Sequence, residues 1–225
     1  MEAIVLRMPV RSVALLLSVL LLTPFTFAFD TPLSDQAIRE AYFLGQRNDE
    51  KTGEFLEKYR RHFAIPESGP WISTVELLTP YAETVELSRQ RSFGYSAQSA
   101  AKDYRERGNL IRVTVTIEFT ETYGYLMEQD VKQRSGSTKA FAFRSPEFWK
   151  DFSYRLFDGD DVVEPLSREG HPTFRSDNYN TVMTGATVTL IYNAEKISSS
   201  ADAAVVVDIS DGRQAIAAFD LAALR

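Results

Sequence analysis

The chain of 225 residues contains no cysteine and only two histidines, His62 and His171. Without cysteine it cannot form a disulfide, carry a lipid on an N-terminal cysteine or bind a metal through thiolates. A zinc site needs three or four ligands from histidine, cysteine or carboxylate groups, and two histidines far apart in the sequence supply too few. We therefore expect no metal and no cofactor.

Several motifs of catalysis and modification are also missing. The sequence has no Gly-x-Ser-x-Gly nucleophile motif, no Gly-rich phosphate loop and no dinucleotide-binding fingerprint. It also lacks the Asn-x-Ser/Thr triplet that accepts N-linked glycans. For a protein that leaves the cytoplasm, the absence of disulfides and glycans fits a bacterial envelope better than a eukaryotic secretory route.

Acidic residues outnumber basic residues in the chain. The chain has 25 Lys and Arg against 31 Asp and Glu, a net charge of -6 at pH 7. Phosphates repel such a protein, so we expect no nucleic-acid partner and no binding to anionic lipid. Aromatic residues are plentiful, with 15 Phe and 10 Tyr, and a chain of this length can bury a stable core without disulfides.

The first 28 residues have the order of a secretory signal peptide. Arg7 and Arg11 form a basic region, and an apolar run follows over residues 13–22. Small residues then occupy the −3 and −1 positions before a predicted cleavage between Ala28 and Phe29. Residues 1–28 are therefore interpreted as a signal peptide and residues 29–225 as a single exported domain, periplasmic or extracellular.

Two features of this segment stay open. A retained membrane anchor is the alternative to a cleaved signal, although the apolar run covers only about half of a 30 Å hydrocarbon core. Translation can start at Met1 or at Met8, because Glu2 is unusual in a basic signal region. Contact with a membrane is expected only through this segment, if it is uncleaved.

Apolar periodicity predicts two helices early in the exported part. Ser34 is the expected N-cap of the first. Thr52 is the expected N-cap of the second, whose apolar stripe runs from Phe55 to Phe63 and places His62 at a helix end.

Two more helices are expected before residue 109. Thr79 followed by proline is a typical helix start and predicts a helix over residues 81–90, although the alternation within it also fits a strand. Ser96 begins the next helix and Gly108 ends it.

Strict alternation over residues 110–120 is the strongest strand pattern in the chain. It predicts a sheet with one buried face and one wet face. Further strands are expected over residues 71–78, 140–143, 154–157, 162–163, 187–192, 203–210 and 213–221. Residues 145–149 are expected to open a short helix.

Polar segments between these strands are interpreted as loops. Residues 132–138 are expected to form a hairpin loop, and residues 166–180 a long polar loop that carries His171. Asp211-Gly212 is expected to be a two-residue turn.

The fold class that follows is α+β. The helix-rich part covers residues 29–108, and an antiparallel β-sheet or β-sandwich covers residues 109–225.

Few residues are candidates for chemistry. Asp158, Asp160 and Asp161 could offer oxygen ligands to calcium, but their spacing does not fit a calcium-binding loop, and a solvated turn is the simpler interpretation. His171 is the best candidate for a catalytic base.

The hypothesis from sequence is a non-enzymatic exported protein with a binding or assembly role in the cell envelope. Its partner would be an unidentified envelope protein or polymer. Residues 166–180 and 132–138 are the expected interaction surface, because loops on a rigid sheet often carry recognition residues. The alternatives are an envelope hydrolase that uses His171 and a membrane-anchored extracytoplasmic domain.

Overall fold

The computed structural model describes residues 29, 31–91, 93–124, 126–133, 136–176, 181–199 and 202–225, without the side chains of residues 126–133 and 136–141. The predicted signal peptide, including Ala28, lies outside the described residues, whereas Phe29 is packed into the core at 2% exposure. Within the described part of the chain, no helix is both long enough and apolar enough to span a bilayer.

The helices follow local capping signals. They are α2 (Asp35–Arg47), α3 (Glu50–Glu57), α4 (Pro80–Gln90) and α5 (Ala97–Arg107). Ser34, Thr79 and Ser96 cap α2, α4 and α5, since each side-chain oxygen accepts a hydrogen bond from a first-turn backbone N–H. The first helix and the two later helices therefore begin where the sequence predicts.

Five strands form the larger antiparallel sheet in the order β1-β2-β3-β9-β8. Their bounds are β1 (Arg60–His62), β2 (Pro70–Leu78), β3 (Leu110–Phe119), β9 (Thr181–Asn193) and β8 (Ser167–Ser176). Strand β3 is central, and Ile111, Val113, Val115 and Ile117 are all fully buried on one face. The alternation of this strand is confirmed.

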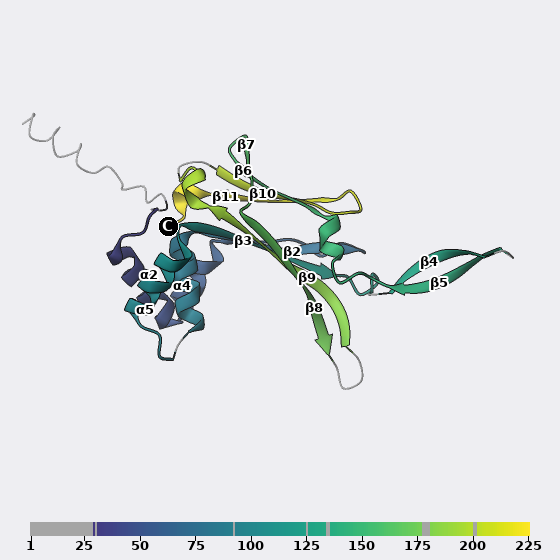
Figure 1. The fold of residues 1–225 in the computed structure, drawn as a ribbon, viewed down its shortest axis with the longest axis horizontal. Coiled ribbons are helices and arrows are strands. Elements are labelled where there is room, and N and C mark those ends of the chain that lie inside the picture. The colour runs from purple at the N-terminus through teal and green to yellow at the C-terminus, as the bar shows by residue number, and fades with distance from the viewer. Residues whose placement is uncertain are drawn as a thin grey trace, which may run out of the picture.

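Four strands form a second antiparallel sheet in the order β11-β10-β6-β7. Their bounds are β6 (Ser153–Asp158), β7 (Asp161–Val163), β10 (Asp202–Asp208) and β11 (Gln214–Asp220). Short 3-10 turns are η1 (Phe148–Asp151), η2 (Ala194–Lys196) and η3 (Leu221–Ala223). Two further strands, β4 (Leu126–Gln133) and β5 (Gly136–Phe143), pair with each other as a hairpin that projects from the body (Figure 1).

The two large sheets pack face to face. One hydrophobic cluster contains residues of both, including Val115 and Val188 from one sheet and Val205 and Phe219 from the other. The helices have a second cluster of their own around Ile38 and pack at one end of the sheets (Figure 1). The fold is therefore α+β with antiparallel sheets.

Two arginines form hydrogen bonds between the two sheets along one side. The Arg61 guanidinium of β1 donates a 2.8 Å hydrogen bond to the Ala218 carbonyl of β11 and lies 4.5 Å from the centre of the Phe219 ring. Arg213 donates a 2.7 Å bond to the Pro70 carbonyl at the start of β2.

The prediction for the second helix is partly wrong. Asp49, rather than Thr52, is the N-cap, and the helix ends at Glu57. Residues 60–62 instead form strand β1, so His62 lies on a sheet edge and not at a helix end. The apolar stripe misled because Tyr59 is buried by the sheet core while Phe63 packs only partly against it.

The predicted polar loop over residues 166–180 is also wrong, because residues 167–176 form strand β8. Residues 177–180 lie outside the described residues. Pro172 is tolerated because an edge strand has one unpaired side, where a missing N–H costs little. Gly170 is required by packing, since a Cβ there would lie 2.3 Å from the Trp149 indole.

Two smaller predictions need correction. The expected hairpin loop over residues 132–138 is shorter, because β4 continues to Gln133 and β5 begins at Gly136. The turn between β10 and β11 is longer than two residues. Ile209 and Arg213 still share a backbone hydrogen bond, and Gly212, at φ +89°, completes the turn.

Candidate functional site

The strand register aligns side chains into rows that cross the five-stranded sheet. Directly opposed residues of antiparallel strands share a face. The central row contains His62, Thr74, Thr116, Thr187 and His171. The neighbouring row contains Arg60, Glu76, Thr114, Thr189 and Glu169. Both rows lie on the face opposite the sandwich core, which we call the concave face.

Four threonines form the centre of the concave face. Thr114 lies opposite Thr189, and Thr116 lies opposite Thr187. Across the described residues, none of their four hydroxyls makes a hydrogen bond to another protein group. The backbone groups beneath them are used by the strand ladders, so these hydroxyls are the groups that a ligand would meet.

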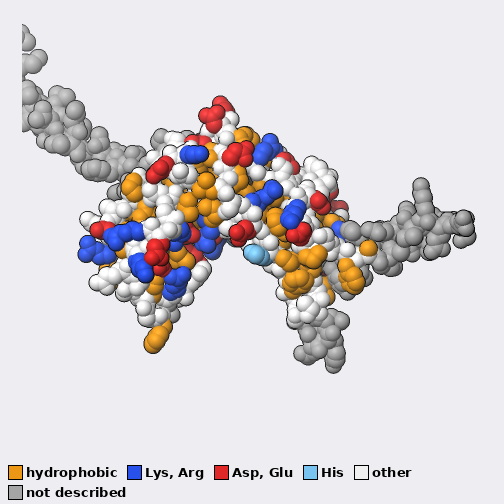
Figure 2. Space-filling model, in the orientation of Figure 1, with side chains coloured by type: hydrophobic (Ala, Val, Ile, Leu, Met, Phe, Trp, Pro, Cys, Tyr) orange, Lys and Arg blue, Asp and Glu red, His pale blue; other side chains and the backbone are white. Residues whose placement is uncertain are grey.

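Two hollows lie on this face and meet at Thr116. The inner hollow has a volume of about 310 Å³ and is lined by residues of β1, β2 and β3. The outer hollow has a volume of about 490 Å³ and lies between the far ends of β3, β8 and β9. Figure 2 shows the molecule hollowed here, between the helices on one side and the β8–β9 end on the other.

The charges of the inner hollow are paired. The Arg60 guanidinium lies 2.7 Å from a Glu76 carboxylate oxygen, and His62 Nε2 lies 2.7 Å from Glu57 Oε1. The other ring nitrogen of His62 lies 3.3 Å from the Thr74 hydroxyl. The inner hollow therefore presents a nearly neutral, polar wall.

The outer half of the face is different. Glu118, Glu169, His171 and Arg175 are exposed, and none of their side chains forms a hydrogen bond or ion pair within the described residues. Both signs of charge are therefore available to a ligand at this end.

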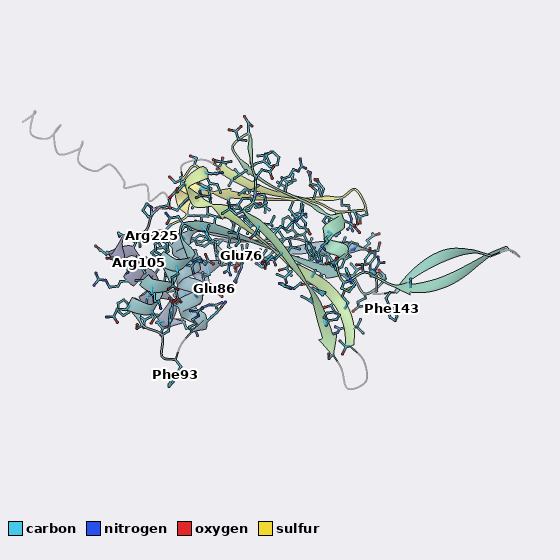
Figure 3. The ribbon with its side chains drawn as sticks, in the orientation of Figure 1. Glu76, Glu86, Phe93, Arg105, Phe143 and Arg225 are labelled. Atoms are coloured by element: carbon cyan, nitrogen blue, oxygen red, sulfur yellow. The ribbon has the colours of Figure 1, made fainter. Side chains whose placement is uncertain are left out.

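The helical end of the face is closed by buried carboxylates of α4. Glu83, 5% exposed, lies 3.1 Å from Arg107 and 3.7 Å from Arg112 of β3. Burial opposes ionisation of Glu86, but hydrogen bonds from Arg89 and Gln90 outweigh it and hold its pKa below the usual range. Figure 3 labels Glu86 beside Glu76 where helix and sheet meet.

His171 does not lie in a catalytic arrangement. It is exposed on β8, opposite Thr187, and its ring makes no hydrogen bond to any described residue. His62 and His171 are separated by four strand spacings, about 19 Å, so they cannot share one metal ion. A hydrolase would need His171 bonded to its nucleophile.

The acidic clusters give no metal site in the described parts of the chain. No group of three or more His, Asp or Glu side chains there is placed to hold a metal ion. Asp158 instead accepts a 2.8 Å hydrogen bond from the Ser198 backbone N–H. A second polar cluster in the sequence, Asp177, Asn178 and Asn180, falls outside the described residues.

The sequence alone predicts only part of the concave face. Alternation identifies Thr114, Thr116 and Glu118 as the wet side of one strand. The Thr-x-Thr pattern repeats at Thr187 and Thr189, but only the register shows that the two pairs lie side by side.

Known proteins do not identify this chain. No protein-family model matches it, and no curated protein sequence matches it. The geometry of the concave face therefore carries the functional argument.

Proposed function

We propose that this chain is an exported, non-enzymatic binding protein of the bacterial envelope. Its concave face holds the envelope partner, a protein or a polymer. The hydroxyls of Thr114, Thr116, Thr187 and Thr189, which have no partner within the described residues, carry this proposal. They present donors and acceptors in a fixed pattern on rigid strands, which favours recognition over chemistry.

Export rests on the residue pattern of the first 28 residues. The basic region, the apolar run and the small residues before Phe29 support a cleaved signal peptide. Phe29 packs into the sandwich core, so the folded domain uses the chain from the proposed mature N-terminus onward.

The hydrolase alternative loses its best residue, because His171 stands without a hydrogen-bonded nucleophile in the described structure. The interaction surface also shifts. Of the predicted segment, residues 167–176 contribute through the concave side of β8, as a strand and not as a loop.

A photo-crosslinking amino acid placed at Thr116 or Thr187 tests the binding surface. In intact producing cells, both positions should give adducts of raised mass. The control position is Ile216 on the outer face of β11, which is 57% exposed. Adducts that are absent, or equally abundant from Ile216, would reject the concave face as the binding surface.

Intact-mass analysis of fractionated cells tests export. A soluble product that begins at Phe29 supports a cleaved signal. A full-length product in the membrane fraction would instead establish the anchored domain.

A further inference from the structure

We infer that the outer hollow binds a small zwitterion, namely a free amino acid or a short peptide with a free ammonium and a free carboxylate. This inference goes beyond the proposed function, because it adds a site for a small ligand at one end of the concave face, beside the threonine rows proposed to hold the envelope partner.

The first argument is the placement of opposite charges on opposite walls. Glu118 belongs to β3 and Arg175 to β8, and strand β9 runs between them. The register aligns Glu118 with Gly185 and Thr173, so the carboxylate wall and the β8 wall are two strand spacings apart, about 10 Å. At this separation the two charges do not pair directly, and each can bind a ligand group.

The second argument is the strand between these walls. Gly185 of β9 is buried and lies opposite both Glu118 and Thr173. A Cβ at this position would lie 1.9 Å from the Ile117 carbonyl oxygen, so the close pairing of β3 with β9 requires glycine. No side chain of β9 therefore stands between Glu118 and Thr173 in this row.

The third argument is the remaining lining. Thr116, Thr173 and Thr184 bring hydroxyls that can bond to a peptide group. Phe119, Val182 and Met183 supply an apolar wall that suits a short aliphatic side chain. The volume of about 490 Å³ falls within the range of small-molecule sites, about 300–1,000 Å³.

The charge pattern also disfavours simpler ions. Glu118 and Glu121 would repel a simple anion drawn to Arg175, and Arg175 would repel a simple cation. A ligand that carries both charges gains from both walls. A zwitterion therefore matches the hollow better than phosphate or a metal ion.

Isothermal titration calorimetry with capped and uncapped ligands tests this inference. The probes are alanine, Ala-Ala, N-acetyl-Ala-Ala and Ala-Ala amide. We expect the wild-type protein to bind Ala-Ala, and removal of either terminal charge to weaken binding about ten-fold or more. Comparison of alanine with Ala-Ala distinguishes a free amino acid from a peptide.

Two variants test whether Glu118 binds the ammonium of the ligand and Arg175 its carboxylate. For Glu118→Gln, the affinities for Ala-Ala and N-acetyl-Ala-Ala should differ less than they do for the wild type. The affinities for Ala-Ala and Ala-Ala amide should differ as much as they do for the wild type. In Arg175→Gln the pattern should reverse. Glu54→Gln and Arg39→Gln, which change exposed side chains on the helices, are the controls and should behave as the wild type.

Equal affinity for all four probes, or no binding of any of them, would overturn the inference. Thermal melting checks that each variant is folded, and the ligand series on the wild-type protein decides the question even if a variant fails. If the calorimetry fails while Thr116 and Thr187 still give specific adducts in cells, the proposed binding function stands and only the ligand class is wrong.

Discussion

The carboxylate of Glu83 lies between guanidinium groups from two elements, Arg107 of α5 and Arg112 of β3. It is 5% exposed, whereas both arginines remain partly solvated. A buried charge of this kind is tolerated only because its partners are present. At the residue scale, it is the group that connects two helices with the central strand.

Glu83→Gln should destabilise the fold by about 1–3 kcal/mol, since it removes the charge that both arginines face. Urea unfolding of the purified protein measures the effect. Glu106→Gln is the matched control, because Glu106 is exposed and lies 3.7 Å from the equally exposed Lys102, so we expect a change below about 0.5 kcal/mol. Equal effects of the two substitutions would show that the buried contacts contribute nothing.

Local chemistry explains why single-residue predictions succeeded at the caps and failed at α3. Ser34 and Ser96 each precede an apolar stripe without a competing cap residue, so the sequence identifies each cap. At α3 two cap residues compete, and Asp49 bonds to the Thr52 N–H while the Thr52 hydroxyl donates to the Leu44 carbonyl. The sequence contains both possibilities, and the packing of Thr52 against α2 decides between them.

At the scale of elements, Gly185 allows strand β9 to pair closely with strand β3. The pairing of β8 with β9 shifts register at this position, between Thr173 and Phe174, which marks a β-bulge. The bulge lies beside the outer hollow, which Thr173 and Thr184 line.

Gly185→Ala should therefore destabilise the protein by roughly 1–3 kcal/mol, because the new Cβ meets backbone atoms of Ile117 that cannot turn aside. Thermal or urea unfolding checks the sign. Gly53→Ala is the matched control. Gly53 lies within α3 with no atom near its Cβ position, so alanine should stabilise by about 0.5–1 kcal/mol. Destabilisation by both substitutions would contradict the argument.

The sequence predicts a strand correctly where one face of the strand is buried. It does not do so where the residues of the strand are mostly exposed. Strand β3 is covered by the second sheet on one side, which forces alternation. Strand β8 is an edge strand whose residues are mostly exposed, so its pattern resembles that of a polar loop. The rows of the concave face depend on register, which the sequence of a single strand does not contain.

At the scale of the whole molecule, Arg225 joins the helices to the sheets (Figure 3). Its backbone exchanges hydrogen bonds with the Tyr59 hydroxyl, and its carbonyl also accepts one from Thr79. Its guanidinium pairs with Glu40 of α2 and lies 4.4 Å from the centre of the Tyr81 ring. Burial raises the pKa of Tyr59 to about 12, so this contact stays neutral across the physiological range.

Arg225→Ala should lower stability at pH 7 by about 1 kcal/mol, through loss of a partly exposed ion pair and a ring contact. Hydrogen bonds from Arg225 and Gln36 hold the pKa of Glu40 below its usual value. The stability that this gives is present above the unfolded pKa and is lost as pH falls. The variant should therefore lose less stability than the wild type between about pH 5 and pH 3.

Denaturant unfolding at several pH values measures this difference. Lys196→Ala, a change at an exposed lysine of η2, is the control and should follow the wild-type curve. Parallel curves for Arg225→Ala and the wild type would show that the Glu40 contact does not contribute.

The two sheets are held to each other along both margins. At the β11 side Arg61 and Arg213 form hydrogen bonds between the sheets, and at the β8 side the Trp149 indole packs against Gly170. Glu118 and Arg175, by contrast, belong to one sheet, in which hydrogen-bond ladders from β3 through β9 to β8 set the spacing of the strands. The width of the outer hollow is therefore preformed, and a ligand has to fit it without a rearrangement of the two sheets.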